Sequence, residues 1–152
     1  MKLLERAYGW FLRAANACQS PLLLVIRLYW GWQFWQSGWG KLMSLPRVTE
    51  YFASLGIPAP ALNAHFIALL EAGGGVLLAL GLASRPVALP LAIDMVMAYV
   101  IADREALGAF LTDPDKFYNA TPYTFLFASL LILIFGPGKF SLDSLIVWYR
   151  KK

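Results

Sequence analysis

The chain has 152 residues, of which 59% are hydrophobic, 15% are aromatic and 14% are charged. Soluble domains contain roughly 45–50% apolar and about 25% charged residues, and the mean hydropathy of this chain is +0.58. A soluble core of this size could not bury so much apolar surface, so the composition predicts a membrane protein in contact with lipid and excludes a disordered chain. Cys18 is the only cysteine, which excludes a disulfide scaffold.

The formal net charge is +4, but the basic residues gather near the two ends of the chain. This distribution is typical of the membrane-facing termini of a membrane protein, and it gives no support to a nucleic-acid partner.

Residues 1–20 predict an amphipathic helix that lies on the inner membrane surface, because polar and apolar residues alternate with helical spacing. A cleaved secretory signal is the alternative, and residues 15–18 (ANAC) faintly resemble a lipoprotein processing site. Glu5 and Arg13 interrupt the apolar region that a signal needs, so we expect the segment to be retained.

Four apolar runs, separated by proline, glycine or charged residues, predict transmembrane helices. They cover residues 22–45, 64–83, 86–102 and 120–136. A helix needs ~20 residues to cross a bilayer, and the last run lacks the polar face expected in a soluble bundle. We predict an all-α membrane protein with a four-transmembrane-helix bundle over residues 21–143, followed by a basic cytoplasmic tail over residues 144–152.

The positions of Lys and Arg predict the orientation of the bundle. Eight of them lie in the N-terminal segment, the second loop and the tail: Lys2, Arg6, Arg13, Arg85, Lys139, Arg150, Lys151 and Lys152. Three lie in the first and third loops: Arg47, Arg104 and Lys116. Since Lys and Arg are enriched in cytoplasmic loops, both termini are expected in the cytoplasm.

The first and third loops are then the outer loops, and each contains a helical pattern. Apolar residues between Val48 and Leu55 recur with helical spacing, and Gly56 follows as a natural stop. In the third loop we expect a helix that begins after Asp103 and irregular chain over residues 112–115. Asn63 is a candidate N-cap for the second span.

Four ionisable residues lie inside the predicted spans: Arg27, Lys41, Glu71 and Asp94. An unpaired charge at mid-helix costs ~2.5–3.5 kcal/mol on insertion scales. Arg27 and Lys41 either extend to their nearest membrane surfaces or turn inward. In the second case Lys41 meets Glu71, which lies at a similar depth, and Arg27 is left for Asp94 or Gln33. Asp94 has a further interpretation, as a protonated acid bonded to a neighbouring helix.

Five further residues are candidates for lining a quinone or ligand site: Trp30, Phe34, His65, Gly74 and Tyr99. Flat aromatic side chains beside polar groups suit a quinone ring, and the glycines at 73–75 leave room for a ligand. Helix packing explains the same residues equally well. His65 is the only histidine, so one chain cannot supply a bis-histidine haem site. We find no metal-ligand spacing and assign no catalytic residue.

Several motifs in order give the chain a family resemblance. They are RLYWG at 27–31, GWGKL at 38–42, FASLGIP at 52–58, LEAGGG at 70–75, LGLASR at 80–85 and GPGKFSLD at 136–143. This series closely resembles the DoxX family of small four-helix membrane proteins, over residues 21–143. Arg27, Lys41, Glu71 and Arg85 fall on polar motif positions of the family, and residues 103–119 have no counterpart.

The DoxX family is named after small subunits of archaeal quinone-linked enzymes, the terminal quinol oxidase and thiosulfate:quinone oxidoreductase. The resemblance therefore implies a bacterial inner-membrane protein in or near respiratory redox chemistry, without implying an activity of its own. Our first hypothesis is a membrane subunit of a quinone-linked redox system, with a partner subunit that supplies electrons.

Two other classes of function remain open at this point. One is a small transporter that uses Glu71 or Asp94 as its ion site, and the other is a non-catalytic assembly partner, which includes a homo-oligomer. A hydrated cavity that reaches Glu71 from one side would favour transport, a dry aromatic slot would favour quinone binding, and a closed bundle would favour assembly.

Overall fold

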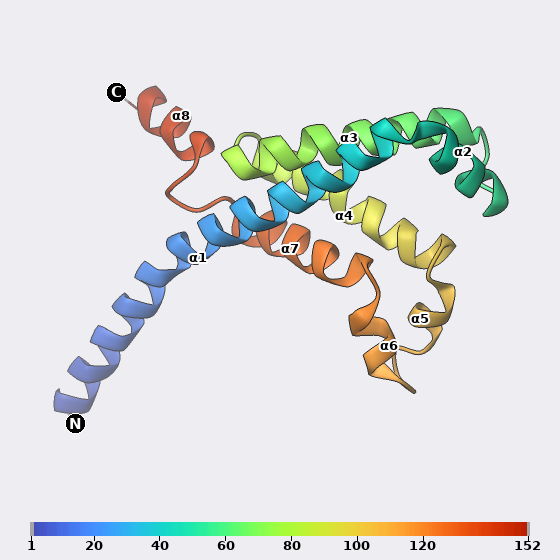
Figure 1. The fold of residues 1–152 in the computed structure, drawn as a ribbon. Coiled ribbons are helices and arrows are strands. Elements are labelled where there is room, and N and C mark those ends of the chain that lie inside the picture. Colours follow the sequence, from blue (N-terminus) through green and yellow to red (C-terminus); the bar gives the residue numbers. More distant parts are fainter. Residues whose placement is uncertain (1, 152) are drawn as a thin grey trace.

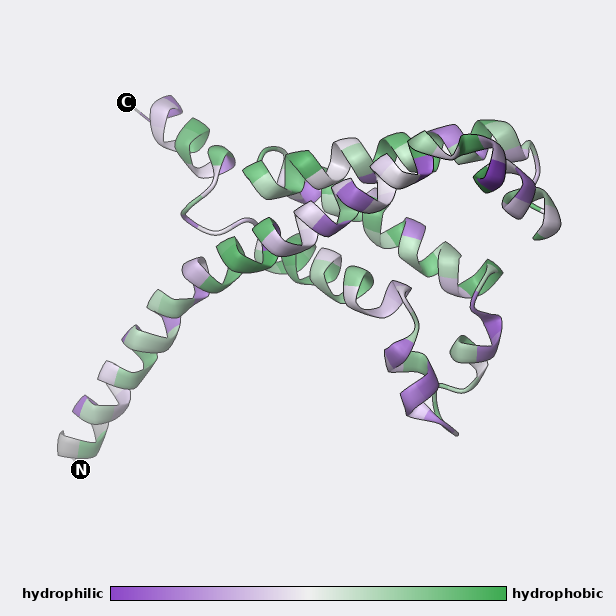
Figure 2. Cartoon of the chain, viewed as in Figure 1, coloured by the Kyte–Doolittle hydropathy of each residue, from purple (hydrophilic) through white to green (hydrophobic). Residues whose placement is uncertain are grey.

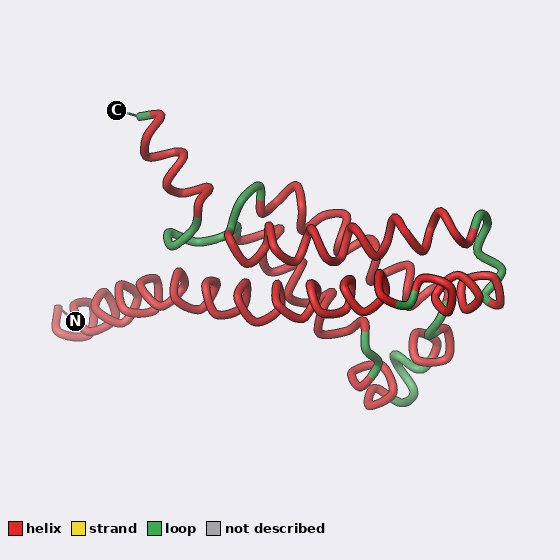
Figure 3. Tube along the Cα trace, turned by 45° about the horizontal axis from the view of Figure 1, so that its top comes forward, coloured by secondary structure: helices red, strands yellow, loops and turns green. Residues whose placement is uncertain are grey.

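A computed structural model describes residues 2–151 of the chain, without the side chains of residues 2, 3 and 5. This part contains eight helices and no strand (Figure 1). Short loops join the helices along the whole trace (Figure 3). The helices are α1 (Lys2–Met43), α2 (Leu45–Ser54), α3 (Pro60–Leu80), α4 (Ser84–Ile101), α5 (Arg104–Gly108), α6 (Pro114–Asn119), α7 (Pro122–Phe135) and α8 (Leu142–Arg150).

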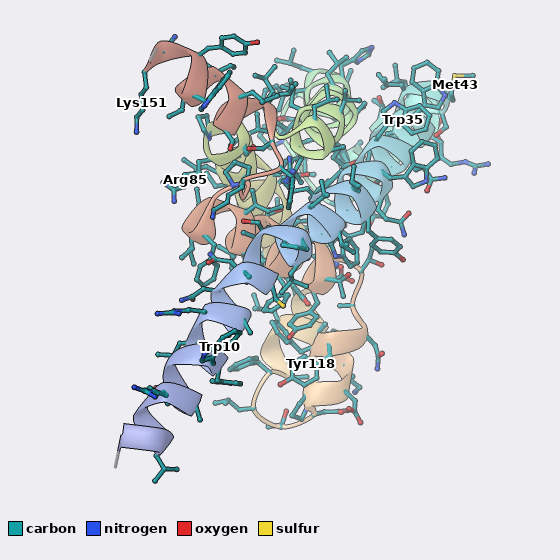
Figure 4. The ribbon with its side chains drawn as sticks, turned by 90° about the vertical axis from the view of Figure 1, so that its left-hand side faces the viewer. Trp10, Trp35, Met43, Arg85, Tyr118 and Lys151 are labelled. Carbon is teal, nitrogen blue, oxygen red and sulfur yellow. The ribbon has the colours of Figure 1, made fainter. Side chains whose placement is uncertain are left out.

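Helix α1 is continuous for 42 residues and contains Pro21 in its interior. The chain therefore stays helical through the proline at which the sequence suggested a boundary, and the placement of the N-terminal segment on the membrane surface stays a prediction. The first part of α1 projects from the bundle as an arm (Figure 1). Trp10 lies on this arm, outside the bundle (Figure 4), with 74% of its surface exposed. Other apolar side chains of the arm are exposed as well, among them Leu4, Tyr8 and Phe11.

The first and third loops fold largely as their sequences predict. The first forms α2, and its end is marked by Gly56, whose φ of 74° is the left-handed conformation that glycine favours. In the third loop α5 begins after Asp103. The expected irregular chain over residues 112–115 is partly wrong, because α6 begins at Pro114, where a proline needs no hydrogen-bond partner for its nitrogen.

Helices α3 and α4 are long and apolar enough to cross a membrane, whereas α7 is apolar but has 14 residues. Figure 2 shows the hydrophobic colours over these three helices and hydrophilic colours on α5 and α6. Helix α3 begins at Pro60, so Asn63 is not its N-cap, and the Asn63 amide instead donates to the Pro58 carbonyl at 2.7 Å. It ends at Gly81, where the Leu82 amide bonds to the Leu77 carbonyl at 3.0 Å.

The helices pack as two pairs, α1 with α3 and α4 with α7. Small residues bring the first pair into backbone contact: a Cβ at Gly31 would lie 2.7 Å from the carbonyl oxygen of Gly75. Both pairs meet in a core in which Phe34, Leu78 and Ile132 have no exposed surface. Beyond this core the pairs diverge, one towards α2 and the other towards α5 and α6 (Figure 1).

Candidate functional site

A cavity of about 550 Å³ lies where the two helix pairs diverge, and we call it the outer cavity. Its walls come from α1, α2, α3, α4 and the start of α7. Most of the lining is apolar, and it includes Phe52, Leu55, Ile67, Met95, Ile101 and Phe125. Three ionisable side chains from the middle of the bundle also line it: Lys41, Glu71 and Asp94, which we call the outer cluster.

Lys41 and Glu71 form an ion pair, as their similar depth in the sequence predicted. The Lys41 ammonium donates to the Glu71 carboxylate and also to the Ser37 hydroxyl at 2.8 Å, one helical turn earlier on α1. The side chain of Glu71 is 4% exposed and that of Lys41 is 26% exposed. Lys41 therefore turns inward, and the alternative in which it extends to the membrane surface is wrong.

Asp94 approaches this pair from α4, close to both Glu71 and Lys41. Its Oδ2 atom is buried and has no hydrogen-bond partner among the described residues. A buried polar atom without a partner is uncommon in proteins, and at the wall of a cavity it is a candidate contact for a ligand or for water. The outer cluster thus places an ammonium group and two carboxyl groups at the wall of an apolar cavity, and one oxygen of the Asp94 carboxyl is buried without a partner.

Arg27 lies at the other end of the bundle. The prediction that it pairs with Asp94 or Gln33 is wrong, because its partner is a backbone carbonyl. Its guanidinium is fully buried and donates from Nη2 to the Phe140 carbonyl at 2.5 Å. The guanidinium lies directly against Gly81, because a Cβ there would overlap with its Nη1. Nε and Nη1 have no hydrogen-bond partner in the described part of the chain.

Asp143 lies beside Arg27, Gly81 and Phe140. We call these four residues the inner cluster. Its carboxylate accepts hydrogen bonds from the amides of Ala83 and Ser84, at 2.7 and 2.9 Å, and so caps the start of α4. Its own amide donates to the Gly81 carbonyl at 2.9 Å. The motif at 136–143 therefore carries the chain past Arg27 of α1 and across the junction between α3 and α4.

None of the five proposed ligand-lining residues lines the outer cavity. Two of them support its wall from behind: the rings of Trp30 and Phe34 lie 5.1 and 4.7 Å from the ring of Phe125. His65 Nδ1 lies 2.7 Å from the Ala61 carbonyl oxygen in its own helix, to which the Nδ1–H tautomer donates. A Cβ at Gly74 would contact Leu91, which indicates helix packing. The Tyr99 hydroxyl donates to the Phe117 carbonyl at 2.7 Å.

Sequence reasoning named all three members of the outer cluster and Arg27 of the inner cluster, but it missed the residues that surround them. Ser37 and Phe125 carried no signal, because an isolated serine or phenylalanine in a span is common. Asp143 did carry one, since it ends the motif at 136–143 on which the family resemblance partly rests. Among the described residues, no group of three His, Cys, Asp or Glu side chains is placed to hold a metal ion.

Comparison with known proteins shows similarity to one family model and to several bacterial membrane proteins. The sequence model of the DoxX family matches residues 22–104. The chain is 34% identical over 139 residues to uncharacterized membrane protein Rv3486 of Mycobacterium tuberculosis, covering 86% of this chain and 85% of the relative. It is 30% identical over 134 residues to inner membrane protein YphA of Escherichia coli, covering 84% and 92%.

A third relative carries a functional name. The chain is 27% identical over 128 residues to CatD of Bacillus subtilis, which is provisionally named an oxidoreductase, and the match covers 84% of this chain and 89% of CatD. No solved structure matches the chain.

Proposed function

Because the chain belongs to the DoxX family of membrane proteins, we propose that it spans the bacterial inner membrane four times, through α3, α4, α7 and the part of α1 that follows Pro21. YphA, one of its relatives, is named an inner membrane protein. We further propose that both termini lie in the cytoplasm, with α2, α5 and α6 on the outer side, because Lys and Arg are concentrated on the terminal side.

We propose that the outer cavity binds a quinone or quinol and that the protein serves a quinone-linked redox system. The observation that carries this proposal is the combination of an apolar cavity with the outer cluster at its deep end. Small-molecule sites are mostly apolar and contain a few polar groups that fix the orientation of the ligand. A lipid-soluble ring has access to a site at this depth from within the membrane.

The outer cluster has the chemistry that the polar end of such a ligand requires. The Lys41 ammonium is a hydrogen-bond donor for a carbonyl oxygen, and the carboxyls of Glu71 and Asp94 are acceptors for a hydroxyl group. Both acids lie close to one lysine, so the cluster is electrically neutral when the two carboxyls share one proton. Such a cluster holds a proton next to the ligand and passes it on during oxidation or reduction.

Electrons have to come from another protein, because this sequence contains no motif for flavin, haem or metal binding. We therefore propose a partner subunit that carries a redox cofactor. The provisional name of CatD as an oxidoreductase supports a redox role.

The test is to purify the protein in mild detergent, extract it and assay the extract for quinone. Ubiquinone and menaquinone analogues are then titrated into the wild type, Glu71→Gln and Glu50→Gln, where Glu50 is an exposed acid of α2 outside the outer cavity. We expect bound quinone and saturable titrations in the wild type and in Glu50→Gln, and weaker binding in Glu71→Gln. No quinone in the extract and flat titrations would overturn the proposal and leave the assembly partner as the better hypothesis.

Transport is the second candidate, and one observation favours it. Asp94, whose Oδ2 has no hydrogen-bond partner among the described residues, lines a cavity that also has walls in the first and third loops, as an ion or solute site reached from one side would. Uptake of labelled solute into proteoliposomes, driven by a pH gradient and abolished in Asp94→Asn, would support transport over quinone binding.

A further inference from the structure

A second pocket, of about 450 Å³, adjoins the outer cavity, and we call it the vestibule. About half of its lining is polar, and the polar part consists of Asp103, Arg104, Glu105, Lys116 and Asn119, which lie between the end of α4 and the end of α6. The two pockets share one stretch of wall, residues 101–104. The apolar site that contains the outer cluster is therefore next to a pocket that is suited to water.

The third loop, which builds the vestibule, is held against α4 by specific contacts. The ring of Tyr99 stacks on the ring of Phe117 with centroids 4.8 Å apart, and its hydroxyl donates to the Phe117 carbonyl. The Arg104 guanidinium donates to the Val100 carbonyl at 2.7 Å, which fixes it at the end of α4. The shared wall is thus a defined part of the fold.

In the opposite direction the outer cluster faces closed packing. The core between the two clusters contains Phe34, Leu78 and Leu91, none of which has exposed surface. Alongside it, α1 and α3 touch through their backbones at Gly31 and Gly75. Close-packed apolar side chains leave no space for a chain of water molecules.

We propose that the outer cluster exchanges water and protons with one side of the membrane only, the side of α2, α5 and α6, and that the vestibule is the route. A proton leaves a carboxyl group of the cluster for water in the outer cavity, passes residues 101–104 into the vestibule, and returns by the same path. This inference rests on the outer cavity of the proposed function, but not on the identity of its ligand. For a quinol site, it fixes the side on which protons are released.

The test measures which positions are accessible to water. Single cysteines are labelled with a membrane-impermeant methanethiosulfonate, which reacts with the thiolate form of cysteine, and that form requires contact with water. Cys18 is first replaced by serine, and right-side-out and inverted membrane vesicles are compared. Ala98→Cys probes the outer cavity. Ile93→Cys, which is 54% exposed on the same helix but outside the cavity, probes the lipid-facing surface, and Ala88→Cys probes the closed core.

Two exposed positions identify the two sides without any assumption about topology: Glu50→Cys in α2 and Arg150→Cys in α8. We expect Ala98→Cys to be labelled completely from the side that labels Glu50→Cys and to be protected from the side that labels Arg150→Cys. Ile93→Cys and Ala88→Cys should remain unlabelled from both sides. If Ala98→Cys fails to accumulate in the membrane, Met97→Cys, which also lines the cavity, replaces it.

Labelling of Ala98→Cys from the side of Arg150, from both sides, or from neither would overturn the proposal, as would labelling of Ala88→Cys. Addition of a quinone analogue separates this inference from the proposed function. Protection of Ala98→Cys by the analogue supports both, whereas unchanged one-sided labelling supports the access route and counts against quinone as the ligand.

Discussion

The two basic residues that α1 carries into the bundle have different environments, although both are turned inward. Lys41 pairs with a carboxylate on α3 and lies at the wall of a cavity, with part of its side chain exposed. Arg27 is fully buried, donates to a backbone carbonyl and lies against the backbone at Gly81. The outer cluster thus has space beside it for another molecule, and the inner cluster is enclosed by the chain itself.

This difference indicates a division of roles along α1. A charge enclosed by backbone atoms has no other partner available, so its contribution is to hold the loop at 136–143 against the helix ends. A charged group at a cavity wall can form a hydrogen bond to a ligand in addition to its bond within the protein. Fewer protein atoms pack around such a group. We therefore expect changes in the inner cluster to affect stability and changes in the outer cluster to affect binding.

The largest expected effect is the loss of Arg27. Arg27→Met removes a buried cation and leaves the Phe140 carbonyl without its donor, and the loss of a hydrogen bond to a charged group costs about 1.5–3 kcal/mol. Unfolding in mixed micelles with increasing dodecyl sulfate measures this loss. Arg85→Met is the matched control, because Arg85 is exposed and donates only to the Ile134 carbonyl at 3.1 Å among its described bonds. Equal losses in both variants would contradict the role of the inner cluster.

A smaller effect is expected where α1 meets α3, between the two clusters. A Cβ at Gly75 would lie 2.5 Å from the Gly31 carbonyl oxygen, so Gly75→Ala forces the helices apart, and such overpacking costs about 1–3 kcal/mol. Gly73 has no atom within 4 Å of its Cβ position. Gly73→Ala should therefore stabilise α3 by up to about 1 kcal/mol through helix propensity. The same micelle titration checks both, and equal effects would contradict the close contact.

The ion pair of the outer cluster should show a measurable coupling energy. Lys41→Met and Glu71→Gln each leave a partner behind, so the double variant should lose less stability than the sum of the two, by about 0.5–3 kcal/mol. Each single loss should stay below that of Arg27→Met, because the exposed part of Lys41 keeps some contact with solvent. Strict additivity would contradict the pairing.

The sequence predicted features that follow from the residue pattern of a single helix or from the position of a residue along its span. The pairing of Lys41 with Glu71 followed from depth, and the helix at α2 followed from the spacing of its apolar residues. Arg27 could not be predicted in this way, since its partner is a backbone carbonyl in a loop more than a hundred residues later. That contact also depends on the absence of a side chain at Gly81.

The candidate ligand-lining residues show a second limit of sequence reasoning. Trp30, Phe34 and Tyr99 are aromatic and lie within spans, but composition does not reveal which face of a helix meets the cavity. That face depends on how the two helix pairs diverge, and the divergence depends on where α1 and α3 touch through glycines. The continuity of α1 through Pro21 has a similar origin, since a membrane helix tolerates a proline that its sequence pattern marks as a boundary.

The smallest expected effect on stability is that of Asp94→Asn. This variant tests whether Asp94 contributes to stability together with the Lys41–Glu71 ion pair. Because Asp94 Oδ2 has no hydrogen-bond partner, the substitution should lower the free energy of unfolding by less than Glu71→Gln does. In the Glu71→Gln background the same substitution should cost more, since Asp94 is then the nearest remaining anion for Lys41. The four variants of this cycle are compared in one micelle titration. A loss in Asp94→Asn alone that equals the loss in Glu71→Gln would show that the three side chains form one structural unit, and that Asp94 is not held ready for a ligand.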